Sequence, residues 1–250
     1  MGGALHAAFW GLVGGSALVL GVLITSLIQV PRRAVAAIMA FGSGVLISAL
    51  SFDLMQEAYE SGGFFATVAG FLGGAAVYTA VNIVISRRGG HDRKRSGGQQ
   101  QDASEGSGLA IAVGALLDGI PESMVIGTSL LAGKGVSIVA VTAVFLSNVP
   151  EGLSSAAGMR KSGRSNAYIY GVWGGIAIAS SIAAMVGYVA LAGASAQYIA
   201  GVMALAAGAI LAMIVDTMIP EAFETAHEYA GLVTVGGFLV AFALSKIGAG

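Results

Sequence analysis

The stretch "LLDGIPESMVIG" (residues 116–127) places two acids, Asp118 and Glu122, in an otherwise apolar segment long enough to cross a membrane. On a helix these two acids are four residues apart, so they share one face. Pro121 lies between them and removes one hydrogen bond to the carbonyl four residues earlier. At membrane depth a freed carbonyl is tolerated only beside protein or a watery cavity. The stretch therefore predicts a helix that faces a polar interior.

A second stretch, "LSNVPEGLSSAAG" (residues 146–158), repeats this pattern on the next predicted helix. Its Pro150 and Glu151 align with the proline and glutamate of the first stretch. Ser147 and Asn148 precede the glutamate by four and three residues and share its face. One such pair could be a structural kink with a protonated or hydrogen-bonded acid. Two matched copies favour an oxygen-rich cation site.

Composition supports a membrane setting for both stretches. Apolar residues make up 56% of the 250 residues, charged residues only 10%, and the mean hydropathy is +0.84. These values are typical of a polytopic membrane protein. The 39 glycines suit close helix packing in lipid. The absence of cysteine excludes disulfides and thiolate metal sites, and a net charge of -1 gives no reason to expect a nucleic-acid partner.

The chain divides into eight apolar segments, each near the roughly 20 residues that a spanning helix needs. We expect a single transmembrane domain over residues 1–250, with a polar, flexible cytoplasmic loop over 87–107 between the third and fourth spans. The predicted spans are about 5–29, 34–60, 64–86, 108–131, 136–159, 166–192, 197–224 and 229–249.

Ten of the twelve basic residues lie in alternate loops, which predicts the orientation. They occupy the first, third and fifth connections, whereas Lys134 and Lys246 lie on the other side. By the positive-inside rule, the first group of connections is cytoplasmic and both termini are outside. The sequence thus predicts a multi-pass protein of the inner (plasma) membrane with the lipid bilayer as its surroundings.

Ten of the thirteen acids lie within or near spans, and no Lys or Arg lies in mid-span beside them. An acid in the bilayer costs at least about 2.5–3.5 kcal/mol on insertion scales, so it usually faces a cavity or a partner. Carboxylates without a basic neighbour must be protonated or must bind a cation. This distribution predicts cation handling.

An internal repeat adds further candidates. Residues 44–60 resemble residues 208–224, which makes the second and seventh spans equivalent and predicts an inverted repeat of spans 1–3 and 6–8 around spans 4 and 5. Asp53 and Asp216 lie deep enough to reach a central cavity. The remaining acids of the repeat read most simply as a solvated rim: Glu57, Glu60, Glu221 and Glu224.

The motifs "DGIPES", "SNVPEG" and "IPEAFE" resemble those of the ZIP (Zrt/Irt-like) divalent metal transporters, especially the short bacterial type. The resemblance covers the whole chain. It implies eight spans, both termini outside, a variable cytoplasmic loop after the third span and, in many members, a homodimer. It also implies movement of zinc, iron, manganese or a similar ion toward the cytoplasm, by an elevator-like shift that gives alternating access.

The chain departs from the family pattern at several ligand positions. Asp118 stands where relatives commonly have His, and Gly119, Ser147 and Thr217 replace other family ligands. We expect one main metal site made of oxygen ligands, which suits manganese, magnesium or calcium better than zinc, although zinc also accepts carboxylates. The predicted ligands are Asp118, Glu122, Ser147, Asn148 and Glu151, with Asp216 or Asp53 as an additional ligand.

Two other classes compete with a carrier. A divalent-cation channel would use the same acids, and saturable uptake against ohmic single-channel current separates the two. An intramembrane aspartyl protease would need two acids that share a proton. The sequence contexts of Asp53, Asp118 and Asp216 contain neither the Tyr-Asp nor the Gly-x-Gly-Asp motif of that class. We therefore expect no enzyme and no cofactor, with the divalent metal as transported substrate.

Overall fold

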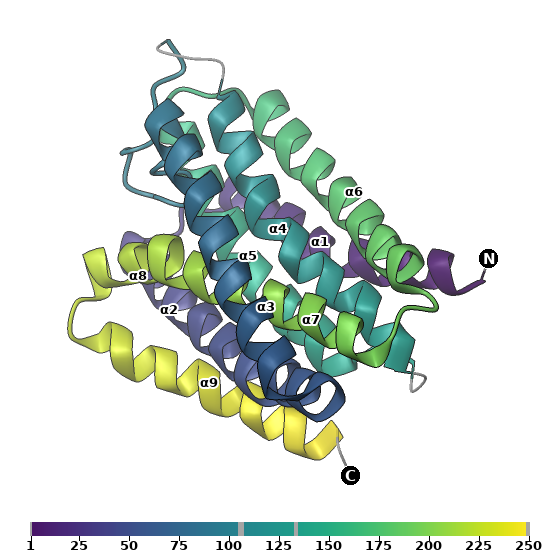
Figure 1. The fold of residues 1–250 in the computed structure, drawn as a ribbon. Helices are drawn as coiled ribbons and strands as arrows, with labels where there is room; N and C mark the ends of the chain where they lie inside the picture. The colour runs from purple at the N-terminus through teal and green to yellow at the C-terminus, as the bar shows by residue number, and fades with distance from the viewer. Residues whose placement is uncertain (1, 105–107, 133–134, 249–250) are drawn as a thin grey trace.

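A computed structural model describes residues 2–104, 108–132 and 135–248, and within these ranges the chain is helical with no strand. Residues 105–107 of the predicted loop and Lys134 of a predicted turn lie outside the described residues. Seven helical segments are long and apolar enough to cross a membrane. The predicted class, a polytopic membrane helix bundle, is confirmed at this level. Figure 1 shows the bundle, with α9 along one side and α6 along another.

The outer ends of the apolar helical segments lie within about a turn of the predicted span ends, but the predicted second and seventh spans each contain more than one element. The helices are α1 (Gly2–Leu27), α2 (Arg32–Ala49), α3 (Met55–Ile85), α4 (Leu109–Ser129), α5 (Ile138–Lys161), α6 (Asn166–Leu191), α7 (Ala196–Met213), α8 (Ile219–Ala226) and α9 (Tyr229–Gly248). Short π-helical turns, η1 (Leu50–Leu54) and η4 (Ile214–Met218), join α2 to α3 and α7 to α8, and η2 (Ser86–Gly90) follows α3. A 3-10 turn, η3 (Leu130–Ala132), follows α4.

The second apolar segment, Arg32–Gly90, is 59 residues long, far more than one span of about 20 residues needs. It is interrupted at Gly63, whose φ of 74° and ψ of 177° are not helical. Side chains are excluded from this backbone region, so only glycine adopts it readily. The predicted break at residues 61–63 is therefore present, and α3 consists of two helical parts.

The internal repeat extends well beyond the matched sequence. α1 and α6 each have 26 residues, α2 and α7 each have 18, and η1 and η4 each have five. The first residues of each pair are separated by the same 164 positions, as are Gly63 and His227. Within the described ranges, His227 is the one non-glycine residue with positive φ, at 43°. Both repeats thus break their backbone at the same position.

Close helix contacts at glycine follow the same equivalence. A Cβ atom at Gly44 would lie 1.9 Å from the carbonyl oxygen of Thr234, and one at Gly208 would lie 1.9 Å from that of Phe71. These contacts pack α2 against α9 and α7 against α3. A side chain at either glycine would push the helices apart, so the sequence permits backbone approach that larger residues would prevent.

α4 and α5, which carry the two Pro-Glu stretches, lie outside the repeat and pack between its halves. α4 contacts α6 and α7, whereas α5 contacts α1 and α2. Glycine again permits the approach: a Cβ at Gly127 of α4 would lie 2.0 Å from the Ala184 carbonyl oxygen. One at Gly152 of α5 would lie 2.1 Å from the Leu18 carbonyl oxygen. The central pair is thereby held by one half of the repeat on each side.

Several connections meet at one end of the bundle. The Lys161 Nζ at the end of α5 donates to the Ser96 carbonyl oxygen at 2.6 Å. Arg95 pairs with Glu224 near the end of α8, with 2.7 Å between Nη1 and Oε2. Arg32, at the start of α2, lies 3.8 Å from the same Glu224. The connections after α1, α3, α5 and α8 therefore share this end.

Candidate cation site

Three carboxyl groups lie at the centre of the bundle and are called the acid cluster here: Asp118, Glu122 and Glu151. Asp118 and Glu122 lie on one buried face of α4, and each is only 1% exposed. Glu151, on α5, is 3% exposed. The helices continue through Pro121 and Pro150, so each proline lies inside its helix. The predicted shared face of the α4 acids is present.

Arg93 reaches into the acid cluster from the segment that follows α3. Its guanidinium forms a two-pronged pair with Asp118, with Nε–Oδ2 and Nη2–Oδ1 distances of 2.9 Å each. Tyr78 donates to the same carboxylate at 2.8 Å, and Arg93 Nη1 donates to the Asn82 side-chain oxygen at 2.9 Å. Such paired, charge-assisted hydrogen bonds are strong and fix the orientation of both groups.

Lys94 joins the acids of α4 and α5. Its ammonium lies 2.8 Å from Glu151 Oε1 and 3.3 Å from Asp118 Oδ2, and the residue is 3% exposed. A single positive charge thus lies between two carboxylates that come from different helices. The positive charge between these carboxylates is therefore the ammonium group of Lys94, a side chain of the protein itself.

The prediction that no basic side chain neutralises the buried acids is wrong. It assumed that basic residues outside the spans stay at the surface, whereas Arg93 and Lys94 fold back between the helices. The composition of residues 87–107 predicts a flexible loop because it has few apolar groups. Pairing with buried carboxylates gives two of its residues a different reason to be buried.

Glu122 differs from the other two acids because neither of its carboxyl oxygens has a hydrogen-bond partner within the described part of the chain. It lies within electrostatic reach of Glu151, Lys94 and Asp118. With all three acids ionised, the two basic groups leave one negative charge in excess. A buried carboxyl group without a partner is costly unless it takes up a proton or a cation.

Burial alone would lower the pKa of Arg93, but the charge and hydrogen bonds of Asp118 outweigh it and raise that pKa above its ordinary value. Arg93 is therefore a fixed positive charge. Lys94 takes the position between the carboxylates, and among residues 2–104, 108–132 and 135–248 no three Asp, Glu or His groups are arranged to hold a metal ion. The metal-ligand roles predicted for the acids stay predictions.

The two polar residues before Glu151 are buried but turned to the backbone. Ser147 Oγ donates to the Val144 carbonyl oxygen at 2.9 Å in its own helix. Asn148 Nδ2 donates to the Gly14 carbonyl oxygen at 3.0 Å and so ties α5 to α1. Ser147 and Asn148 are near the acid cluster along α5, but their hydrogen bonds go to backbone carbonyl oxygens and hold the helix in position.

Asp53 and Asp216 lie in the equivalent π-helical turns and outside the acid cluster. Asp53 Oδ1 accepts a hydrogen bond from Ser245 of α9 at 2.8 Å. Asp216 is exposed beside an open groove that Asn82, His91 and other polar groups line. Asn82 donates to Asp216 at 3.2 Å and accepts from Arg93, so Asp216 is linked to the cluster indirectly.

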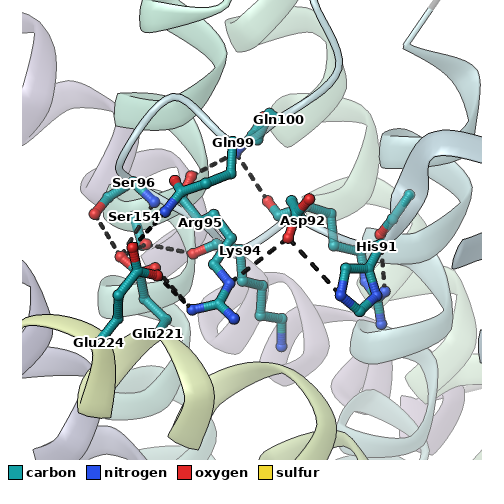
Figure 2. A network of polar contacts seen from close by, with 12 residues as sticks. His91, Asp92, Lys94, Arg95, Ser96, Gln99, Gln100, Ser154, Glu221 and Glu224 are labelled. Atoms are coloured by element: carbon teal, nitrogen blue, oxygen red, sulfur yellow. Dashed lines mark hydrogen bonds and ion pairs between the residues drawn. The ribbon is translucent and has the colours of Figure 1, made fainter.

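A second polar network holds the segment that carries Arg93 and Lys94 (Figure 2). Glu221 Oε1 accepts from the Ser96 backbone amide at 3.1 Å, from the Ser96 hydroxyl, and from Ser154 at 3.2 Å. Glu224 accepts from Arg95 at 2.7 Å and from Gln99 at 2.5 Å. The solvated-rim interpretation is wrong for Glu221, which is buried, and agrees with the exposure of Glu224.

Sequence reasoning missed Arg93, Lys94, Tyr78 and Ser96 as partners of the predicted acids. The "RKR" run at residues 93–95 stands out in the loop, but nothing in its spacing indicates which carboxylates it meets. Tyr78 lies four residues before Asn82 in the third predicted span, so the two share a helix face. That polar pair is the one pattern that could have indicated an inward face there.

No protein-family model and no curated protein matches this chain. The resemblance to the ZIP transporters therefore rests on the Pro-Glu motifs and stays a prediction.

Proposed function

We propose that this protein is a membrane carrier for divalent metal cations, with Asp118, Glu122 and Glu151 as the groups that bind the cargo. The observation that carries the proposal is Glu122, a buried carboxyl group without a hydrogen-bond partner in the described residues. It lies beside two carboxylates that already share a cation, the Lys94 ammonium. Placing ionisable acids inside a membrane bundle costs free energy, and such acids are typical of ion pathways.

The arrangement of the helices supports eight spans with both termini outside. The break at Gly63 divides the 59-residue segment into two parts, each long enough to cross a bilayer. Connections after α1, α3, α5 and α8 meet at one end of the bundle, as alternating spans require. That end carries most of the basic residues, so we infer that it is cytoplasmic.

The repeat supports alternating access. With four spans between α1 and α6, the two halves run in opposite directions through the membrane in this topology, and α4 and α5 lie between them. Inverted repeats of this kind let a carrier expose a central site to each side in turn. The glycine contacts give the smooth helix surfaces along which one group of helices can slide.

The three side chains of the acid cluster are carboxylates, so they would bind a cargo ion through oxygen atoms. Carboxylates alone favour hard cations such as Mn²⁺, Mg²⁺ or Ca²⁺ over ions that prefer nitrogen or sulfur. We therefore propose manganese as the first cargo to test, with zinc as the comparison ion. A ranking of zinc above all hard ions would contradict this choice without touching the carrier proposal.

The decisive variant is Glu122→Gln. Because Glu122 accepts no hydrogen bond among the described residues, this isosteric change should leave the Tm in detergent unchanged but reduce Mn²⁺ uptake into proteoliposomes to the level of empty vesicles. The matched control is Glu60→Gln, which removes the same charge from an exposed position and should retain uptake. Normal uptake by Glu122→Gln would overturn the proposed site.

A further inference from the structure

The six residues from His91 to Ser96, which we call the plug segment, form a short segment that enters the bundle between two pairs of glycines. Glycine pairs flank it on both sides, at 89–90 and 97–98. Gly89 and Gly98 adopt φ values of 94° and 93°, which L side chains rarely adopt. The segment therefore begins and ends beside glycines whose backbone conformation other residues rarely adopt.

The charge that the plug segment brings into the bundle equals that of a divalent cation. Arg93 and Lys94 together supply two positive charges to three carboxyl groups. If both side chains leave and one divalent ion arrives, the net charge of the buried cluster is unchanged. If the ion arrived while both stayed, it would have to share Asp118 and Glu151 with the Lys94 ammonium that already lies between them, and the two cations would repel one another at low dielectric. Plug and ion therefore exclude one another.

The contacts outside the cluster are of a kind that can open. Arg95 and Glu224 are partly exposed, and exposed ion pairs contribute little, roughly 0–1 kcal/mol. The buried contacts outside the cluster are hydrogen bonds: Glu221 accepts from the Ser96 amide and hydroxyl, Ser154 donates to the Lys94 carbonyl oxygen, and Gln100 donates to that of Arg93 at 3.1 Å. Figure 2 shows the Arg95 guanidinium beside the two glutamates, whereas the Lys94 side chain extends away from them. The segment is thus held at its end by α8 and at its centre by the acid cluster.

We propose that the plug segment is an autoinhibitory element that occupies the acid cluster in place of the cargo, and that cation binding releases it. This inference rests on the proposed function, since it assigns a regulatory partner to the same site. It predicts that a divalent cation and the docked segment compete, with each lowering the affinity of the other.

Trypsin provides a direct readout, because it cleaves after Arg93, Lys94 and Arg95, two of which are buried when the segment is docked. The purified full-length protein in detergent is digested with and without Mn²⁺, and cleavage after the exposed Arg88 serves as the internal reference. Mn²⁺ should accelerate cleavage within the plug segment relative to that reference, and should do nothing in Glu122→Gln. Mn²⁺ affinity is measured separately by calorimetry on the same samples.

Lys94→Gln should raise Mn²⁺ affinity about tenfold, because a charge-assisted contact of the competing ammonium is lost. Arg88→Gln, which removes one exposed charge from the same connection, should leave it unchanged. Should Lys94→Gln unfold the protein, Glu221→Gln tests the same idea without altering the acid cluster, and should speed cleavage at 93–95 in the absence of metal.

The outcomes separate the two proposals. Mn²⁺ binding by the natural chain without faster cleavage, together with equal affinity in Lys94→Gln, would overturn the plug and leave the carrier standing. Mn²⁺ binding by Lys94→Gln alone would support the plug in its strongest form. If neither the natural chain nor Lys94→Gln binds Mn²⁺, the proposed cation site is overturned, and the proposed competition is overturned as well.

Discussion

At the scale of single residues, the Arg93–Asp118 pair is the best-defined interaction of the site. Both side chains are almost fully buried, and each end of the pair has a further partner in Tyr78. A buried pair of this kind contributes little over a well-packed apolar pair, because both charges lose their hydration. Removal of one partner alone destabilises the protein, because the other charge then stays buried without that partner.

We expect Arg93→Ala to lower the stability of the protein by about 3–5 kcal/mol, because the buried Asp118 would lose its two-pronged partner and keep only Tyr78 and the longer Lys94 contact. The double change Arg93→Met with Asp118→Leu should recover most of this loss. Thermal unfolding in detergent, followed by circular dichroism, measures both. If the single and double variants unfold at the same temperature, the pair is not the source of the effect.

At the scale of helices, glycine sets how the elements approach one another. α9 provides a matched comparison in two adjacent residues. A Cβ at Gly237 would lie 2.0 Å from the Phe41 carbonyl oxygen of α2, whereas one at Gly236 would meet nothing within 4 Å. The position of a glycine relative to its partner helix therefore decides its importance, and not its presence in an apolar span.

Gly237→Ala should destabilise the protein by about 1–3 kcal/mol, since the α2–α9 contact has to open to admit a methyl group. Gly236→Ala should be neutral or slightly stabilising, because alanine is the better helix former. The Tm difference between the two variants is the measurement. Equal values would mean that α2 and α9 do not pack as described.

The helices also show which features of the fold the sequence could predict and which it could not. The polytopic helix bundle, the break at Gly63 and the shared face of Asp118 and Glu122 follow from hydropathy, glycine and helical period, and all three were predicted. The insertion of Arg93 and Lys94 was not predicted, because it depends on long-range pairing between a polar connection and two buried helices. Local composition carries no information about such a pairing.

At the scale of the whole molecule, the proposed topology makes a testable prediction of orientation. Two halves whose first two helices match in length lie on either side of α4 and α5 (Figure 1). The end that contains Arg95, Lys161 and Glu224 is the cytoplasmic end under the proposed topology. The connection between α6 and α7 then lies on the opposite side.

The chain has no cysteine, so single cysteines can report this orientation without background. Ser104→Cys should react with a membrane-impermeant maleimide only after the cytoplasmic side is opened, whereas Ala192→Cys should react in intact cells. Both positions are exposed. Labelling of the two from the same side would exclude the proposed arrangement.

The acid cluster lies entirely in the two helices that the repeat does not contain. Asp118, Glu122 and Glu151 belong to α4 and α5, while the duplicated halves supply the surrounding frame. Under the proposed carrier function, substitutions that change the preferred cargo and substitutions that change the surrounding helices would therefore fall on different parts of the chain. Descendants of such a chain can acquire a new ion preference through α4 and α5 while they inherit the frame intact.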